Sequence, residues 1–310
     1  MINFRYHVVS LVAVLASLAI GLVLGAGVLS SGTGSASAVQ VVDLQAETAL
    51  LRERVAAAEN TLAFADAFGA VLQPEQVAGT LTDRSVVVVA LPGADEPTVT
   101  ATRDALSRAG ATVTGTIQVL PEWTDAASGA VLDSLASQLV TSGASLPSSD
   151  GYARGAVVLA SAVLEPAGSS EKDPQDVTAT PQAYAEAGLV ALSEPLSATA
   201  DLAVVVAGGP VADDGEAGRR IAAQVALAAA MDQAGSGAVL AGPPESAGPF
   251  GTVEAVRSDA ELAASLSTVD MAQQSGGRTS AVLALAEQAG GGVGHYGGVG
   301  VDEPLPPASQ

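Results

Sequence analysis

The sequence predicts an α/β protein in which an N-terminal transmembrane helix and a coiled-coil helix precede a mostly parallel sheet with helices on both faces. Two patterns lead to this prediction. Residues 8–29 form an uncharged apolar stretch long enough to span a bilayer, and from Ser85 onward short β-branched runs alternate with helical segments. The mean hydropathy of +0.39 is high for a chain with 15% charged residues, so part of its apolar surface faces something other than water.

The charge balance excludes one class of partner. The 310 residues include 33 acidic and 12 basic side chains, which gives a net charge of -21. A nucleic-acid-binding face needs clustered Lys and Arg, so we expect no nucleic-acid partner, and tight binding to anionic lipid headgroups is disfavoured for the same reason. The absence of cysteine excludes disulfides, thiolate metal sites and cysteine nucleophiles.

The apolar stretch runs from Val8 to Leu29 and would be about 33 Å long as a helix. Arg5 precedes it and no Lys or Arg follows until Arg52, so the positive-inside rule predicts a cytoplasmic N-terminus and an exported C-terminal domain. The alternative is a signal peptide cleaved after the Ala36-Ser37-Ala38 tripeptide. The apolar region of a signal peptide is usually about 7–15 residues, which favours a retained anchor here.

This anchor, residues 1–30, has small residues at every fourth position of one helical face: Ala13, Ser17, Gly21 and Gly25. Small residues let helices approach closely in lipid, which predicts packing of the anchor against another helix. Because such residues are common in membrane spans, the spacing also fits a helix without a partner. Residues 31–38 are rich in Ser, Gly and Ala and predict a flexible connector.

Residues 39–73 predict a coiled-coil helix that ends before Pro74. Glu47 at a g position faces Arg52 at the following e position, and Arg54 faces Glu59 in the same way, as in parallel coiled coils. The sequence therefore predicts a homo-oligomer, with a lone amphipathic helix folded onto the next domain as the alternative. All but one of the a and d positions are apolar: Val41, Leu44, Thr48, Leu51, Val55, Ala58, Leu62 and Ala65.

Residues 80–290 predict one exported α/β domain with five or six strands. Alternating strands and helices favour a mostly parallel sheet. Residues 153–164 fit either a strand or a helix, and their alanines favour the helix. The predicted strands are 85–91, 111–120, 189–192, 202–207, 238–241 and 268–271; the other predicted helices are 97–109, 126–141, 182–187, 215–233, 260–266 and 280–288.

Ligands of parallel α/β sheets bind beyond the carboxyl ends of the strands, here residues 92–96, 208–214 and 242–246. None of these loops matches a phosphate-binding loop or a nucleophile elbow. Asp213 and Asp214 could hold a hard cation or cap a helix. We therefore expect no enzyme and no cofactor.

The two histidines are His7, at the edge of the anchor, and His295, in a Gly/Pro-rich tail predicted over residues 291–310. His295 is the candidate metal ligand, because imidazole is a common ligand of metal ions in proteins. The alternative is a solvated residue of a flexible tail.

Three segments resemble the actinobacterial copper transport protein B family. They are the opening MINFRYHVVSLVAVLASLAIGLVLGAGVLSS, the LSTVD and VLALAEQ segments at residues 266–270 and 282–288, and GHYG at residues 294–297. The resemblance implies an outer-membrane or envelope location, copper as the transported ion and a role in copper homeostasis. The alternative is an oligomeric structural or interaction module that contacts other envelope proteins without binding metal.

Overall fold

The computed structural model describes residues 14–15, 17–18, 34–140, 146–147, 150–169, 174–301 and 303–307. The chain divides into two units between Ala65 and Asp66. Helix α2, Gly34–Val77, covers the predicted coiled-coil segment and begins earlier than expected. The prediction of a flexible connector over 31–38 is therefore wrong for residues 34–38, where Ala36 and Ala38 are good helix formers that extend the following helix.

Pro74 lies inside α2 rather than after its end. A proline removes one helical hydrogen bond, so it needs compensation from packing. Gln73 and Val77, on either side of it, are both buried, and the Gln73 amide donates to the carbonyl of Ser275 at 3.2 Å. These contacts hold the last turn of α2 against the domain and explain why the helix continues to Val77.

The domain is built on a seven-stranded sheet with the order β3-β2-β1-β4-β5-β6-β7. All neighbouring pairs are parallel except β2 with β3, which is antiparallel. The predicted mostly parallel sheet is confirmed, with one more strand than expected. The strands are β1 Ser85–Ala90, β2 Thr112–Val119, β3 Val190–Leu192, β4 Leu202–Val206, β5 Ala238–Ala241, β6 Ser267–Val269 and β7 His295–Tyr296.

The central strands are buried on both faces, as their continuous apolar sequences predict. In β1, Val86 and Val88 belong to one hydrophobic cluster, and Val87 and Val89 belong to the other. Successive side chains of a strand point to opposite faces, so one short run of valines supplies both cores. All four valines are fully buried.

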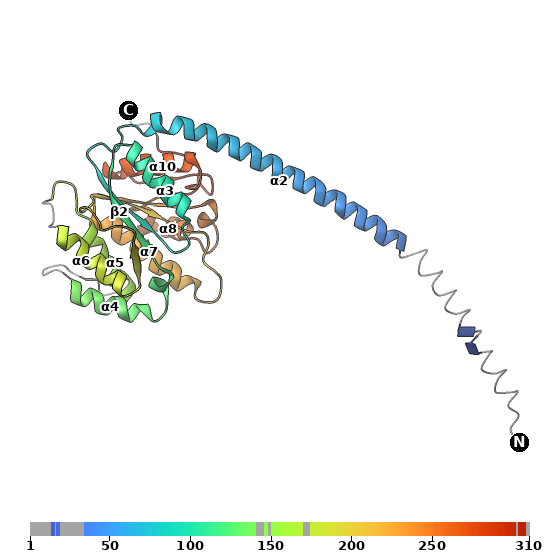
Figure 1. Ribbon diagram of the computed structural model, residues 1–310, viewed down its shortest axis with the longest axis horizontal. Helices are drawn as coiled ribbons and strands as arrows, with labels where there is room; N and C mark the ends of the chain where they lie inside the picture. Colours follow the sequence, from blue (N-terminus) through green and yellow to red (C-terminus); the bar gives the residue numbers. More distant parts are fainter. Residues whose placement is uncertain are drawn as a thin grey trace, which may run out of the picture. The chain divides into compact units, whose positions relative to one another are not determined.

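Helices α3, Glu96–Arg108, and α10, Ser275–Ala289, cover one face of the sheet (Figure 1). Asp95 caps α3 by accepting a hydrogen bond from the Thr98 amide at 3.0 Å. Val99 and Leu106 of α3 and Leu285 of α10 are buried in the cluster on this face. The predicted helix at 280–288 is thus confirmed with an earlier start.

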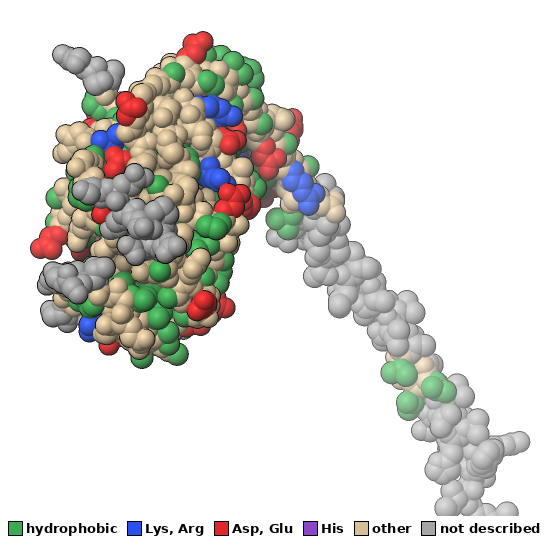
Figure 2. Space-filling model, turned by 60° about the vertical axis from the view of Figure 1, so that its left-hand side comes forward, with side chains coloured by type: hydrophobic (Ala, Val, Ile, Leu, Met, Phe, Trp, Pro, Cys, Tyr) green, Lys and Arg blue, Asp and Glu red, His purple; other side chains and the backbone are tan. Residues whose placement is uncertain are grey.

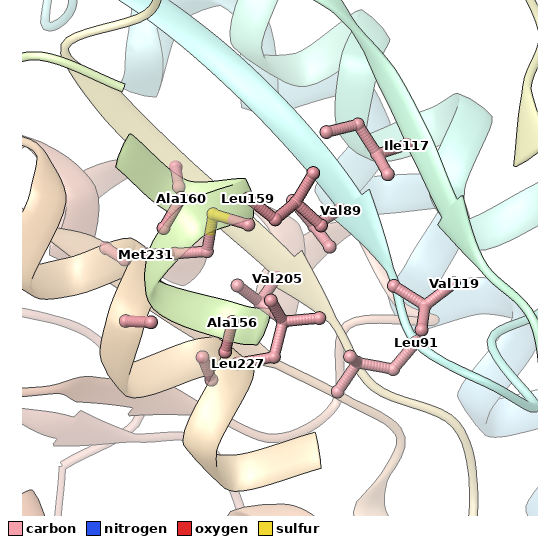
Figure 3. Close-up of a cluster of buried hydrophobic side chains, with 14 of the residues drawn as sticks. Val89, Leu91, Ile117, Val119, Ala156, Leu159, Ala160, Val205, Leu227 and Met231 are labelled. Atoms are coloured by element: carbon pink, nitrogen blue, oxygen red, sulfur yellow. The ribbon is translucent and has the colours of Figure 1, made fainter. Parts of the chain in front are cut away.

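The other face is covered by the helices between β2 and β3 together with α7. Figure 3 shows Ala156 and Leu159 of α5 packed between the strands and Leu227 and Met231 of α7. The ambiguous segment 153–164 is therefore helical up to Val163, and Leu164 forms an isolated bridge with Ala200. These helices are α4 Ser128–Leu139, α5 Gly151–Val163, α6 Pro174–Glu186 and α7 Ala217–Ala234; two short ones, α8 Thr252–Ser258 and α9 Ala260–Ala263, precede β6.

The segment predicted to be a flexible tail supplies the edge strand β7, which pairs with β6 in parallel. Tyr296 of this strand is buried, and its hydroxyl donates to the Glu287 carboxylate at 2.5 Å. The compact unit runs from Asp66 past β7, so it is larger than the predicted 80–290. A two-residue strand in a Gly-rich segment is held by its partner strand and has no sequence pattern of its own.

Candidate functional site

The residues predicted to pack the anchor lie mostly outside the described part of the chain. Only Ser17 is described, in a helical turn with Val14, whose carbonyl accepts a hydrogen bond from the Ser17 hydroxyl at 3.0 Å. A hydroxyl bonded to its own helix leaves no unsatisfied donor, which suits a position in lipid. Ala13, Gly21 and Gly25 are not described, so the predicted packing face stays a prediction.

Within the described residues, one helical stretch, Leu44–Val77, is long and apolar enough to cross a membrane. Its first half includes Glu47, Arg52, Glu53, Arg54 and Glu59, all exposed. Charged side chains are costly in the hydrocarbon core, and these five fall within four turns. These charges argue against a membrane span over the first half of this helix, and residues 8–29 stay the predicted span.

The predicted coiled-coil positions form an exposed apolar stripe on α2. Leu51 and Val55 are 52% and 56% exposed, and Leu44 and Leu62 are comparably open. The one polar position, Thr48, donates its hydroxyl to the Leu44 carbonyl at 2.7 Å and so requires no partner across an interface. The stripe is therefore exposed in this chain, and its pairing with another helix stays a prediction.

The strand-end loops that would hold a ligand are packed against each other. The sheet order reverses between β1 and β4, where a crevice normally opens. A Cβ atom added to Gly208, after β4, would lie only 2.5 Å from the carbonyl carbon of Gly93, after β1. The Leu91 amide also donates to the Val206 carbonyl at 2.8 Å. Backbone therefore fills the place between β1 and β4 where parallel α/β sheets usually bind a ligand.

Asp213 and Asp214 are exposed at the start of α7. The Asp214 carboxylate accepts hydrogen bonds from the Arg220 guanidinium and, at 3.1 Å, from the Glu216 amide. The bond from Arg220 is the main cause that lowers the pKa of Asp214 below its usual value. Among the described residues, no group of three or more His, Cys, Asp or Glu side chains is placed to hold a metal ion. Asp214 is thus engaged by Arg220 and by the amide of the N-cap residue Glu216, although no side chain caps α7 itself.

His295 lies on β7 and is half-buried, not in a flexible tail. Its Nε2 lies 3.1 Å from the Ala263 carbonyl oxygen, and its Nδ1 lies 2.9 Å from the Thr268 hydroxyl. A carbonyl only accepts hydrogen bonds, so we assign the proton to Nε2, and the Thr268 hydroxyl donates to Nδ1. Both ring nitrogens are thus engaged by protein, and a metal could bind only after one of these bonds breaks.

Burial lowers the pKa of His295, and the nearby charge of Arg257 lowers it further. Because the folded pKa lies below the unfolded value of about 6.5, the unfolded chain binds a proton more readily as the pH falls. We therefore expect the wild-type protein to lose stability between pH 7 and pH 5, and His295→Gln to lose less. Thermal unfolding measured by the fluorescence of Trp123, the single and fully buried tryptophan, tests this. The prediction would be contradicted if the unfolding temperatures of the wild-type protein and of His295→Gln fell by the same amount between pH 7 and pH 5.

A groove of about 440 Å³ lies at the opposite end of the sheet, at the amino ends of β1 and β2. Arg84 and Asp201 line it and form an ion pair with Nε and Oδ2 2.8 Å apart. The other Asp201 oxygen accepts hydrogen bonds from the Ser85 amide and hydroxyl. The carboxylate is therefore fully engaged and holds two strands together. The sequence analysis missed this cluster, because Ser85 and Asp201 are far apart in the chain and neither lies in a motif.

The surface of the domain carries mixed charge. On the face shown in Figure 2, Arg side chains lie beside Asp and Glu side chains. Described examples are the ion pairs of Arg154 with Asp133 and of Arg219 with Glu216. Such pairing leaves this face without a broad basic area.

These features define the class of the protein as an α/β domain that follows a long helix in the chain, with the strand-end crevice between β1 and β4 closed by backbone. The chain belongs to the family described as copper transport outer membrane protein, MctB, whose sequence profile matches residues 1–307. The resemblance found in the sequence is confirmed. Family membership associates the protein with the membrane.

Curated relatives match over almost their full length. The chain is 34% identical over 307 residues to the protein named copper transporter MctB of Mycobacterium tuberculosis (strain ATCC 25618 / H37Rv), with 96% of each chain covered. It is 33% identical over 311 residues to the protein of the same name in Mycobacterium leprae (strain TN), again with 96% of each chain covered. The similarity therefore includes both the helical N-terminal part and the domain.

Proposed function

We propose that this protein acts in copper transport and copper homeostasis at the cell envelope, as a non-enzymatic protein with one membrane span. The observation that carries the proposal is the family match over residues 1–307, together with relatives named as copper transporters that align with 96% of this chain. In the proposed arrangement the N-terminus is cytoplasmic and the α/β domain lies outside. The small face of Ala13, Ser17, Gly21 and Gly25 packs the anchor against another helix.

The described side chains favour a role in which copper is cargo rather than a resident ion. Cu(I) prefers thioether and thiolate ligands, and imidazole suits both oxidation states. Met231 is fully buried in the core, and both nitrogens of His295 are hydrogen-bonded. We propose that the protein acts through its placement and its contacts in the envelope, since Met231 and His295 are already used for folding, although the Met271 thioether is only partly buried.

Deletion and complementation test this proposal. We expect a strain without the protein to accumulate copper and to grow poorly in copper-rich medium. Expression of the full chain should restore normal copper content and growth. Expression of the variant His295→Gln should restore copper content and growth equally well, because the imidazole is proposed to be structural. A deletion strain with normal copper content and growth would contradict the proposed role in copper homeostasis. Failure of His295→Gln alone, with normal protein levels, would show that the ring binds copper directly.

A second candidate function is that of an oligomeric module that sets the distance of the domain from the membrane. The exposed apolar stripe on α2 and its flanking charges support it. In a parallel pair of helices, Glu47 would face Arg52 of the second chain and Arg54 would face Glu59, so two-fold symmetry gives four attractive pairs.

Charge reversal tests this module. The double variant Arg52→Glu/Arg54→Glu turns four attractions into repulsions, each worth about 0.2–1 kcal/mol. We expect the dimer dissociation constant of the full chain in detergent to rise about tenfold or more, measured by sedimentation equilibrium. Adding Glu47→Arg and Glu59→Arg should restore association. The matched control is Glu53→Arg at an outward f position, which should leave association unchanged; a monomeric wild-type chain would count against the module.

A further inference from the structure

One side of α2 has two different environments along its length. The coiled-coil stripe runs through Leu62 and Ala65, both exposed. Seven residues after Leu62 comes Gly69, which lies within about 20° of it around the helix and is the next a position. Asp66 and Gln73 are the e positions beside it. The side that carries the coiled-coil stripe therefore continues into the last three turns of α2.

In those last turns, this side of α2 is bonded to the start of α10. The Ser275 amide donates to the Asp66 carboxylate at 2.5 Å, and the Ser275 hydroxyl donates to the Asp66 carbonyl at 2.8 Å. Gln73 donates to the Ser275 carbonyl at 3.2 Å. Gly69 lies so close that a Cβ atom there would meet the Ser275 hydroxyl at 2.4 Å. Four contacts from three residues of α2 thus converge on one buried serine.

This docking completes the fold of α10. The N-terminal residues of a helix have amide donors without helical partners, and the N-cap residue Gln274 supplies no side-chain bond to them. Asp66 provides both an acceptor and a negative charge at this helix end, where a negative charge is stabilising. The contact therefore belongs to the rigid domain, and the boundary between the two units of the chain falls at Ala65/Asp66.

We propose that α2 changes its partner at Asp66. Up to Ala65 its apolar side pairs with α2 of a second copy in parallel, and from Asp66 the same side is held by α10 of its own chain. The coiled coil thus ends at Ala65, although Leu72 occupies a further d position and is 38% exposed. This inference rests on the oligomeric module proposed above and adds the place where the interface ends and the residues that end it.

The chain has no cysteine, so single cysteines report this interface directly. The full chain in membranes would carry Leu51→Cys or Val55→Cys in the stripe, Leu50→Cys at an outward c position as the control, or Leu72→Cys beyond the proposed end. A disulfide needs Cα atoms about 4.4–6.8 Å apart, which paired d or a positions in a coiled coil provide. After mild oxidation with diamide, we expect cross-linked dimer at positions 51 and 55, and at least fivefold less at 50 and 72.

A further variant converts the proposed end into a continuation. Gly69→Leu places an apolar residue at an a position and clashes with Ser275, so it should release the docked turns and raise cross-linking at Leu72→Cys to the level of position 51. Unchanged Trp123 fluorescence and retained cross-linking at Leu51→Cys verify that the domain is folded. Cross-linking at 72 as strong as at 51 in the otherwise unaltered chain would overturn the partner change and leave the coiled coil standing. Absence of cross-linking at positions 51 and 55 would overturn both the coiled coil and the change of partner at Asp66.

Discussion

Replacing Arg257 with alanine is expected to destabilise the domain by about 3–5 kcal/mol, because it leaves the charge of Asp270 buried without its partner. Asp270 is fully buried, and its carboxylate lies 3.0 Å from the Arg257 guanidinium. Arg257 also donates to the carbonyls of Tyr296 and Val299, at 2.9 and 2.8 Å. One side chain therefore compensates a buried charge and fixes β7 and the turn after it.

Urea unfolding of the full chain in detergent, followed by Trp123 fluorescence, measures this effect. The matched control is Arg154→Ala, which breaks the more exposed ion pair with Asp133 and should cost less than about 1 kcal/mol. The double variant Arg257→Met/Asp270→Leu removes both charges and should recover part of the loss. Equal effects of Arg257→Ala and Arg154→Ala would show that the buried pair is not what holds the C-terminal edge of the sheet.

The second large effect is expected at the closed crevice between β1 and β4. Gly208→Ala places a methyl group 2.5 Å from the carbonyl carbon and 2.7 Å from the carbonyl oxygen of Gly93. Both sides of this contact are backbone attached to buried strands, so neither side can yield without moving a strand. We expect a loss of about 1–3 kcal/mol, as for other overpacked positions, in the same unfolding experiment.

The neighbouring residue provides the control for this prediction. Gly209→Ala makes the same chemical change one residue later, where an added Cβ atom meets nothing within 4 Å. It should be neutral or slightly stabilising, because alanine restricts the unfolded chain more than glycine does. If both variants unfold at the same urea concentration, the two loops must separate easily, and the crevice would be open to ligands after all.

The closed crevice bears on the function. In many parallel α/β proteins the reversal of strand order creates the ligand site. Here the Gly93–Gly208 contact occupies that place, and His295 and Asp270 are both used in hydrogen bonds that hold the fold. These observations support a domain that works through its surface and its tether, in agreement with the proposed role of copper as cargo.

The sequence alone determined those elements whose signal is local. The central strands were predictable because a run such as Ser85–Ala90, with four valines in a row, is favourable only in a strand covered on both faces. The helix over residues 39–73 was predictable from its heptads, and the family was predictable from short segments at both ends of the chain. The anchor at residues 8–29 rests on length and the absence of charge, and it stays a prediction.

Only the tertiary structure decided the contacts between distant residues. Strand β7 forms because β6 offers it a partner, not because a Gly-rich segment favours a strand. Gln73 and Val77 keep α2 helical past Pro74 by packing on the domain, and Asp66 caps a helix that begins at Ser275. His295 has both nitrogens bonded because β7 lies beside Thr268 and the chain passes Ala263. Propensity and periodicity depend on near neighbours in the chain, whereas these features depend on which surfaces meet after folding.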